Sequence, residues 1–301
     1  MGLTLGLIGF GEVGGILGRG LLGKPGIDRI LAWDLRFADA DNGAAARRAA
    51  EDTNGITATA SMEALCAEAA LLISAVTASQ TFAVAKEAAR HARRGTRFLD
   101  LNSASPGTKQ RAAEALRAAG VEYVEAGVMT SVPPYGIRVP MLLGGAQAES
   151  LAATLNGWGM DATAVSETLG VASAVKMSRS IMIKGLEALV IESFTTARRY
   201  GVEAQMLATL KETFPQIDWP QQGAYFFSRV VQHGKRRAEE MREAAQTVRE
   251  AGFEPLMTAA IAGRQDAVSQ HARAGLFEGL DGKSAWEDYA DRLIAQAQRE
   301  A

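Results

Sequence analysis

The chain is poor in cysteine, and it has neither a block of basic residues nor a long hydrophobic run. Cys66 is its single cysteine, so no disulfide can form within the chain, as is usual in a reducing cytosol. The net charge of −2 argues against non-specific binding to nucleic acid. No uncharged apolar run reaches the ~18 residues of a membrane span, and the N-terminus lacks the basic region of a signal peptide. We expect a cytoplasmic protein that binds neither nucleic acid nor membrane.

The first apolar run, residues 3–8, leads directly into a glycine-rich turn, Gly9-Phe10-Gly11-Glu12-Val13-Gly14. Gly9 allows a tight turn, Gly11 lets the backbone approach a pyrophosphate, and Gly14 lets the next helix pack closely on the strand. The start of that helix offers free N–H groups and a positive dipole end to phosphates. Asp34 closes the next apolar run, where a carboxylate can accept hydrogen bonds from an adenosine ribose. The segment therefore predicts a dinucleotide-binding site.

Glycine spacing alone is weak evidence, because the same spacing recurs at 18–23. This second match follows a predicted helix instead of a strand, and no acidic strand end follows it at the right distance. It is interpreted as the end of that helix. Only the match at 9–14 has its full context.

The order of apolar runs predicts the fold. Six short runs alternate with alanine-rich helical segments, at 3–8, 29–33, 56–59, 71–76, 96–101 and 121–125. Such alternation is typical of strand–helix units on a parallel sheet, and two further strands are expected at 139–143 and 162–165. We predict an α/β fold in which residues 1–166 form a Rossmann-type doubly wound sheet. Residues 167–301 are expected to form an all-helical C-terminal domain for substrate binding and dimerisation, beginning with a long interdomain helix.

That long helix covers 171–200 and would be about 45 Å in length. Its apolar residues occupy most faces, which is typical of a helix buried between domains or subunits. Too few residues follow it to cover all these faces, so a homodimer is expected.

Small or polar residues follow the later strands, where ligands bind at the carboxyl edge of a parallel sheet. Val76 closes the fourth run and Thr77 follows it, Asn102 and Ser103 follow the fifth, and 127–134 follow the sixth. We expect these segments to line a cofactor groove. Each segment has the alternative of an ordinary loop, and Ser105 with the proline after it can simply start a helix.

Lys176 lies in the first turns of the long apolar helix. Desolvation lowers the pKa of a lysine, and a lysine with a pKa near neutrality can exchange a proton with an alcohol or carbonyl. The alternative is an ammonium that extends into water. Lys184 is a competing candidate, two turns further along and roughly 80° round the helix.

Three segments resemble the β-hydroxyacid dehydrogenase family, which includes 3-hydroxyisobutyrate and 6-phosphogluconate dehydrogenases. They are the glycine turn, the segment Phe98-Leu99-Asp100-Leu101-Asn102-Ser103-Ala104-Ser105-Pro106, and the segment Gly170-Val171-Ala172-Ser173-Ala174-Val175-Lys176. The resemblance implies NAD(P)-dependent oxidation of a small hydroxy acid. It also implies that Lys176 stands in the position of the catalytic lysine.

The chain departs from that family pattern at two places. The family's substrate-binding Ser-Gly-Gly corresponds to Met129-Thr130-Ser131, whose hydroxyls and backbone N–H groups would replace the glycine-backed cradle. The family's asparagine corresponds to Ser180, and Arg179 beside it can clamp a carboxylate or phosphate. These changes imply a different small anionic substrate and a divergent subgroup with its own C-terminal domain.

A cationic segment at 233–237 contains two further candidates for substrate binding, His233 and Arg236. The alternative is a solvated helix start beside Glu239 and Glu240.

The cofactor is expected to be NAD, because the carboxylate of Asp34 repels a 2′-phosphate. NADP is possible, because Arg36 can pair with that phosphate, and no metal site is predicted. Hydride would pass between the nicotinamide and the substrate, with Lys176 as the general acid or base. The alternatives are an imine reductase, which reduces C=N bonds on the same fold, and a non-catalytic dinucleotide sensor.

Overall fold

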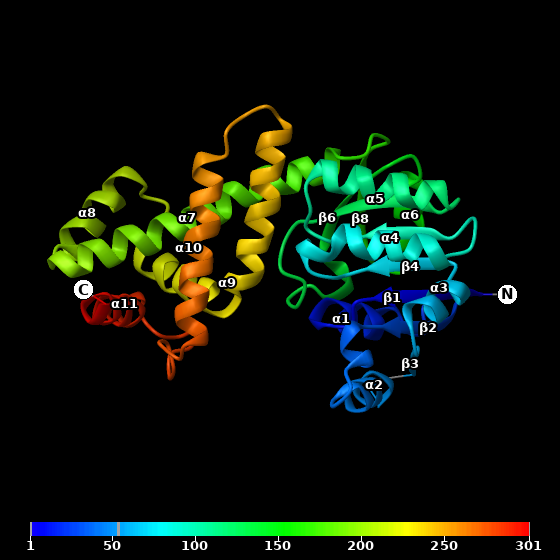
Figure 1. Cartoon of the computed structure of the whole chain (residues 1–301). Coiled ribbons are helices and arrows are strands. Elements are labelled where there is room, and N and C mark those ends of the chain that lie inside the picture. The colour runs from blue at the N-terminus through cyan, green and yellow to red at the C-terminus, as the bar shows by residue number, and fades with distance from the viewer. Residues whose placement is uncertain (1, 53–54, 301) are drawn as a thin grey trace. The chain divides into compact units, whose positions relative to one another are not determined.

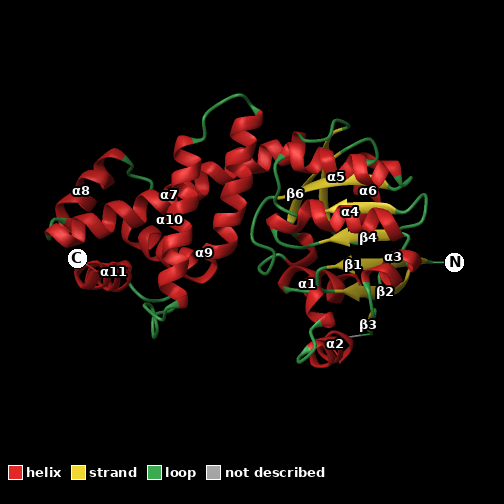
Figure 2. Cartoon of the chain, viewed as in Figure 1, coloured by secondary structure: helices red, strands yellow, loops and turns green. Residues whose placement is uncertain are grey.

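The computed structural model describes residues 2–52 and 55–300 and divides the chain into two compact units, Met1–Met177 and Ser178–Ala301. The N-terminal unit contains a sheet flanked by helices, and the C-terminal unit is helical (Figures 1 and 2). This architecture confirms the predicted fold class. The predicted domain boundary after residue 166 remains a prediction.

The sheet of the N-terminal unit has eight strands in the order β3-β2-β1-β4-β5-β6-β7-β8. The first six strands are parallel, β7 runs antiparallel to β6, and β8 is parallel to β7. All eight predicted runs form strands, whose bounds are β1 (Leu3–Ile8), β2 (Ile27–Trp33), β3 (Ile56–Ala58), β4 (Leu71–Ser74), β5 (Arg97–Asp100), β6 (Glu122–Val128), β7 (Pro140–Gly144) and β8 (Asp161–Ser166).

Helices cover both faces of this sheet, as a doubly wound fold requires. Along β4, Leu71 and Ile73 belong to one hydrophobic cluster and Leu72 belongs to another. Alternate residues of a strand point to opposite faces, so a strand that is apolar throughout is buried on both sides. The helices of this unit are α1 (Glu12–Leu21), α2 (Gly43–Asp52), α3 (Met62–Glu68), α4 (Thr81–His91), α5 (Pro106–Ala118) and α6 (Ala148–Gly157).

The long predicted helix is confirmed as α7 (Val171–Tyr200), 30 residues without a break. Its first residues belong to the N-terminal unit and the rest to the helical unit. Several of its apolar side chains are exposed in a single chain, among them Val175, Met182, Leu186 and Leu189.

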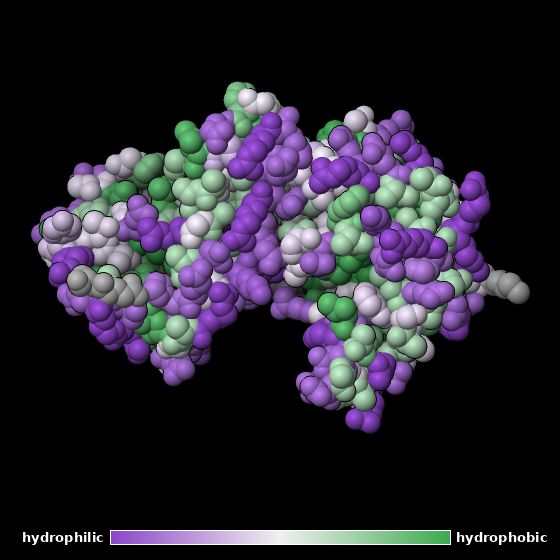
Figure 3. Space-filling view, viewed as in Figure 1, coloured by the Kyte–Doolittle hydropathy of each residue, from purple (hydrophilic) through white to green (hydrophobic). Residues whose placement is uncertain are grey.

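The helical unit continues with α8 (Glu203–Thr213), α9 (Trp219–Glu250), α10 (Leu256–Arg273) and α11 (Trp286–Glu300). Its core is an aromatic cluster in which Phe194 of α7 packs edge-on against Trp286, and Phe227 stacks on Tyr289. Hydrophilic side chains (purple in Figure 3) gather over α9 and α10 on the face shown.

Helix α9 corrects one expectation. The segment 233–237 was expected at or near a helix start, but α9 begins at Trp219, so the segment lies in mid-helix. Pro220 stands in the first turn, where its missing N–H has no partner to lose, and the Asp218 carboxylate caps the helix by accepting from the N–H of Gln221 at 3.1 Å.

Within residues 2–52 and 55–300, no helix is both long enough and apolar enough to cross a membrane.

Candidate functional site

The residues predicted to bind a dinucleotide follow the carboxyl ends of β1, β2, β4 and β5. These four strands are parallel neighbours in the order β2-β1-β4-β5. The fold therefore brings the glycine turn, Asp34, Val76 and Asn102 to one edge of the sheet, where open α/β sheets bind ligands. The segment 129–131 follows β6, the next strand along that edge.

The geometry of the glycine turn fits a dinucleotide. Gly9 has a φ of +89°, a left-handed conformation that side-chain-bearing residues rarely adopt. A Cβ at Gly14 would lie 2.0 Å from the carbonyl oxygen of Gly9, so only glycine permits this approach of α1 to the strand end. A Cβ at Gly11, by contrast, would meet no atom of the described residues within 4 Å. This open side lies at the N-terminus of α1, where phosphates bind favourably.

Asp34 and Arg36 form a hydrogen-bonded network with the backbone of the glycine turn. The Asp34 carboxylate accepts hydrogen bonds from the N–H of Phe10 at 2.7 Å and from Nε of Arg36 at 2.9 Å. The Arg36 guanidinium also donates to the carbonyl of Phe10 at 2.6 Å. Burial opposes ionisation of Asp34, but the hydrogen bonds from Arg36 and Phe10 outweigh it and hold the pKa of the carboxyl below its usual value. The side chain of Arg36 is 63% exposed. It can therefore move away from Asp34 into solvent without creating a buried cavity.

The loops after β4 and β5 are tied together by Asn102. Its side-chain oxygen accepts from the N–H of Val76 at 2.7 Å, and its amide nitrogen donates to the hydroxyl of Ser74 at 3.0 Å. Asn102 thus fixes the backbone at Val76. Thr77, which precedes a short 3₁₀ turn, has its hydroxyl 3.3 Å from that of Ser79.

A buried charge network beneath Asn102 escaped the sequence interpretation. Asp100 forms an ion pair of 2.9 Å with Lys109 of α5, and both side chains are buried. Asp100 also accepts from the backbone N–H of Asn102 and from the hydroxyl of Tyr123 on β6, at 2.7 Å. Burial, reinforced by Asp100, raises the pKa of Tyr123. The sequence signal for this network was an acidic residue, Asp100, at the end of a buried strand, followed by Lys109 on the next helix.

Ser103 and Ser105 differ in role. Ser105 caps α5 by accepting from the N–H of Thr108 at 3.2 Å, with Pro106 as the first helical residue. This confirms the alternative of a simple helix start for Ser105. Ser103 is only partly buried on the loop before it.

The predicted substrate loop and Lys176 both adjoin the end of β6. The N–H of Met129 donates to the carbonyl of Pro140 at 2.9 Å, while Thr130 is exposed and Ser131 is partly buried. A Cβ at Gly127 would lie 3.3 Å from the Cβ of Lys176, so α7 passes close to the backbone of β6. Lys176 is partly buried there, neither enclosed nor fully solvated.

Glu125, two residues before Gly127, is a second residue that the sequence interpretation missed. Its carboxylate is fully buried and binds the start of α7. A glutamate inside an otherwise apolar strand was the available signal, because a buried carboxylate needs hydrogen-bond donors.

The other predicted substrate residues belong to the helical unit. Arg179 is exposed and Ser180 is buried on α7. Arg236, on α9, lies 3.3 Å from Glu240, one turn further along the same helix. His233 lies one turn before Arg237 and is partly buried.

Acidic residues form ion pairs with most of the positively charged side chains in and near the segment 233–237. Lys184 of α7 forms an ion pair of 2.8 Å with Glu240. Arg237 is buried and binds both carboxylate oxygens of Glu187. Burial lowers the pKa of Lys184, although Glu240 opposes this effect. The structure therefore gives Lys184 a structural ion pair within the helical unit.

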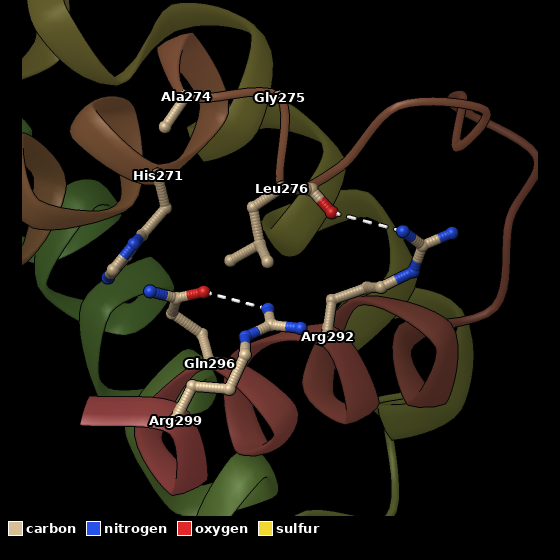
Figure 4. Close-up of a pocket in the computed structure, with 7 residues that line it drawn as sticks. All are labelled: His271, Ala274, Gly275, Leu276, Arg292, Gln296 and Arg299. Atoms are coloured by element: carbon tan, nitrogen blue, oxygen red, sulfur yellow. Dashed lines mark hydrogen bonds between the residues drawn. The ribbon is translucent and has the colours of Figure 1, made fainter. Parts of the chain in front are cut away.

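A separate cavity of about 270 Å³ lies between the end of α10 and α11. Figure 4 shows Arg292 donating to the carbonyl of Leu276 and Arg299 donating to Gln296, with His271 across from them. None of the residues predicted to form the site lines this cavity. Among the described residues, no group of three or more histidine, cysteine, aspartate or glutamate side chains is arranged to hold a metal ion.

The mostly parallel sheet, the glycine turn and the polar carboxyl edge define a dinucleotide-binding protein of the Rossmann class, with a helical second part. Residues 4–154 match the family model described as the NAD-binding domain of 6-phosphogluconate dehydrogenase, and the chain belongs to that family. Residues 197–268 match a second model, a domain of unknown function named DUF1932.

Solved structures agree with this assignment. A conserved hypothetical protein from Sinorhizobium meliloti is 38% identical, with a TM-score of 0.76, over 98% of this chain and 97% of its own. A conserved protein of unknown function, described as similar to 3-hydroxyacid dehydrogenases, is 30% identical, with a TM-score of 0.67, over 90% of this chain and 98% of its own. The 3-hydroxyisobutyrate dehydrogenase of Mycobacterium tuberculosis is 15% identical, with a TM-score of 0.71, over 97% of this chain and 99% of its own. At that identity it shows a shared fold with a dehydrogenase.

Proposed function

We propose that this protein is a cytoplasmic NAD-dependent oxidoreductase that transfers hydride between the nicotinamide and a small anionic β-hydroxy acid. One observation carries the proposal. Lys176 packs beside Gly127 at the end of β6, within the same compact unit as the glycine turn after β1. This supports a site in which a lysine of α7 lies beside the sheet edge that would hold the dinucleotide.

The proposed roles follow from the contacts of each residue. The backbone N–H groups at the start of α1 bind the pyrophosphate, and Asp34 accepts from the ribose hydroxyls. Val76, Thr77, Asn102 and Ser103 line the groove beside the nicotinamide. When bound, the dinucleotide supplies the hydride chemistry. The amine of Lys176 takes the hydroxyl proton during oxidation, or returns it during reduction.

We propose an anionic substrate because the residues predicted to bind it can each donate hydrogen bonds. Thr130 and Ser131 offer hydroxyl groups, the 129–131 backbone offers N–H groups, and Arg179 offers a guanidinium that matches a carboxylate. Ser180, His233 and Arg236 are proposed as further contacts to the substrate.

The test is a screen of small hydroxy acids with NAD and with NADP, followed through nicotinamide absorbance. We expect turnover with a hydroxy acid, and a loss of turnover in Lys176→Ala with cofactor affinity retained. Lys176→Arg keeps the positive charge but cannot release a proton near neutrality, so it should be equally inactive. Lys86→Ala, which alters an exposed lysine of α4, is the control.

Three results would contradict the proposal. Normal turnover by Lys176→Ala would remove the lysine from the chemistry. Turnover only with C=N substrates would identify an imine reductase. Tight dinucleotide binding without hydride transfer to any substrate would identify a sensor.

A further inference from the structure

Glu125 forms a buried carboxylate cap for the helix that carries Lys176. Its side chain is 0% exposed on β6. One carboxylate oxygen, Oε1, accepts from the N–H of Gly170 at 2.7 Å and from the N–H of Ala172 at 3.2 Å. The other oxygen, Oε2, accepts from the hydroxyl of Ser173. Three donors at the start of α7 therefore converge on one carboxylate from a distant part of the chain.

The carboxylate from the sheet takes the place of a side-chain cap from the residue before α7. The first N–H groups of a helix lack partners within the helix, and a preceding side chain usually binds them. Here Gly170 precedes α7, with a φ of +99° and no side chain. A negative charge at this position also interacts favourably with the positive end of the helix dipole.

The same strand fixes the next turn of α7. Glu125 and Gly127 are two residues apart on β6 and so face the same side of the sheet, while Ala172 and Lys176 are one helical turn apart. A Cβ at Gly127 would lie 3.0 Å from the carbonyl oxygen of Ala172 and 3.3 Å from the Cβ of Lys176. The Glu125 carboxylate binds the first turn of α7. The absence of a side chain at Gly127 leaves room for the second turn.

The neighbouring strand leaves room for this arrangement. Glu125 pairs with Gly144 of the antiparallel strand β7. A Cβ at Gly144 would lie 2.6 Å from Oε1 of Glu125, so a larger residue there would displace the carboxylate.

We propose that Glu125 is a positioning residue, which sets the place of Lys176 at the sheet edge through the backbone of α7. The inference rests on the proposed function, in which Lys176 transfers the proton. A proton-transfer group works only within hydrogen-bond reach of the reacting atom, so a shift of the helix start reduces the rate without affecting the glycine turn.

The test uses Glu125→Gln in the full chain. The replacement keeps the shape and one acceptor oxygen, and it removes the charge. Ser173→Ala removes a single donor to the same carboxylate, and Glu122→Gln alters an exposed carboxylate on the same strand as a control. Three measurements are made: hydrogen exchange at residues 170–173, acetylation of Lys176 relative to the exposed Lys86, and kcat alongside the Kd for NAD.

We expect Glu125→Gln to increase exchange at 170–173 roughly tenfold, to alter the Lys176 to Lys86 acetylation ratio, and to lower kcat roughly ten- to a hundredfold. The Kd for NAD should stay within about twofold. Ser173→Ala should change the same quantities in the same direction by less, and Glu122→Gln should change none of them.

Several outcomes would overturn the inference. Unchanged exchange and acetylation would show that Glu125 does not hold the helix start. Faster exchange with unchanged acetylation and kcat would reduce Glu125 to a local stabiliser, and a parallel loss of NAD affinity would indicate general loss of the fold. If exchange and acetylation respond but the wild-type protein turns over no substrate, the positioning role stands and the proposed function fails.

Discussion

Gly127 lies directly against Lys176, and the position of a Cβ at the glycine is only 3.3 Å from the Cβ of the lysine. The same position is 3.0 Å from the backbone oxygen of Ala172. Close packing of this kind leaves no room for an added methyl group without movement of the helix. The close approach of α7 to β6 thus depends on a glycine at position 127.

We expect Gly127→Ala to fold and to lower kcat roughly tenfold or more, because the methyl group displaces the turn of α7 that carries Lys176. Steady-state kinetics and NAD binding would check this, with NAD affinity retained. Gly157→Ala is the matched control, since a Cβ there meets no described atom within 4 Å and its φ is not positive. Equal kcat values for the two variants would argue against tight packing beside Lys176.

The pair formed by Asp34 and Arg36 predicts how cofactor choice can be changed. We expect the wild-type protein to prefer NAD. Arg36→Ala should strengthen that preference, because the carboxylate then faces the ribose without a competing guanidinium. Asp34→Asn should shift the preference toward NADP by about tenfold, equivalent to ~1.4 kcal/mol, because the repulsion of a 2′-phosphate is lost while Arg36 remains.

Titration of NAD and NADP into each of these variants would measure the ratio of the two Kd values. If Asp34→Asn and Arg36→Ala shifted the ratio in the same direction, the assigned roles of the two side chains would be wrong.

Lys184 is expected to stabilise the helical unit without taking part in turnover. Lys184→Met removes an ion-pair partner of the largely buried Glu240, so we expect a loss of about 2–4 kcal/mol in unfolding free energy. The double variant with Glu240→Leu should recover much of that loss. Urea unfolding measures both effects, and wild-type kcat in the double variant would separate Lys184 from catalysis.

The pH dependence of the Lys184 effect has a definite sign. Burial lowers the pKa of Lys184 in the folded state below its ordinary value of 10.5. Between the two values the unfolded chain binds more protons, so stability rises with pH there. The wild-type protein should therefore gain stability relative to Lys184→Met as the pH rises toward 10.5. A constant difference over that window would show that burial does not lower the pKa of Lys184 in the folded state.

The exposed apolar residues of α7 carry the proposal of a homodimer. Met182 is 65% exposed and Leu189 is 54% exposed, and contiguous apolar surface of this kind marks association sites. We expect light scattering to give a dimer for the wild-type protein and a monomer for the double variant Met182→Lys/Leu189→Lys. Leu256→Lys, at another exposed apolar residue, should remain dimeric. A monomeric wild-type protein would contradict the proposal.

The strands and the glycine turn follow from local sequence patterns. Apolar runs in strand–helix alternation predicted the first six strands, and two further strand-like segments predicted the last two. The glycines at 9–14 predicted the turn because all three lie within a few residues of the end of the first strand. The unbroken α7 followed in the same way from a proline-free apolar stretch. Local backbone preference and side-chain periodicity determine these features.

Contacts between distant residues could not be obtained in this way. The pairing of Lys184 with Glu240 and the binding of Glu125 to the start of α7 each join segments far apart in the sequence. The antiparallel direction of β7 concerns two consecutive strands, but no local pattern in the sequence set it. The sequence does not show which residue a charged side chain will pair with. The partner depends on chain topology and on the need to satisfy buried polar groups. The sequence alone determined that a dinucleotide cradle and a candidate lysine exist. The tertiary structure decided that the lysine lies on a helix held by β6, beside the carboxyl edge that carries the cradle.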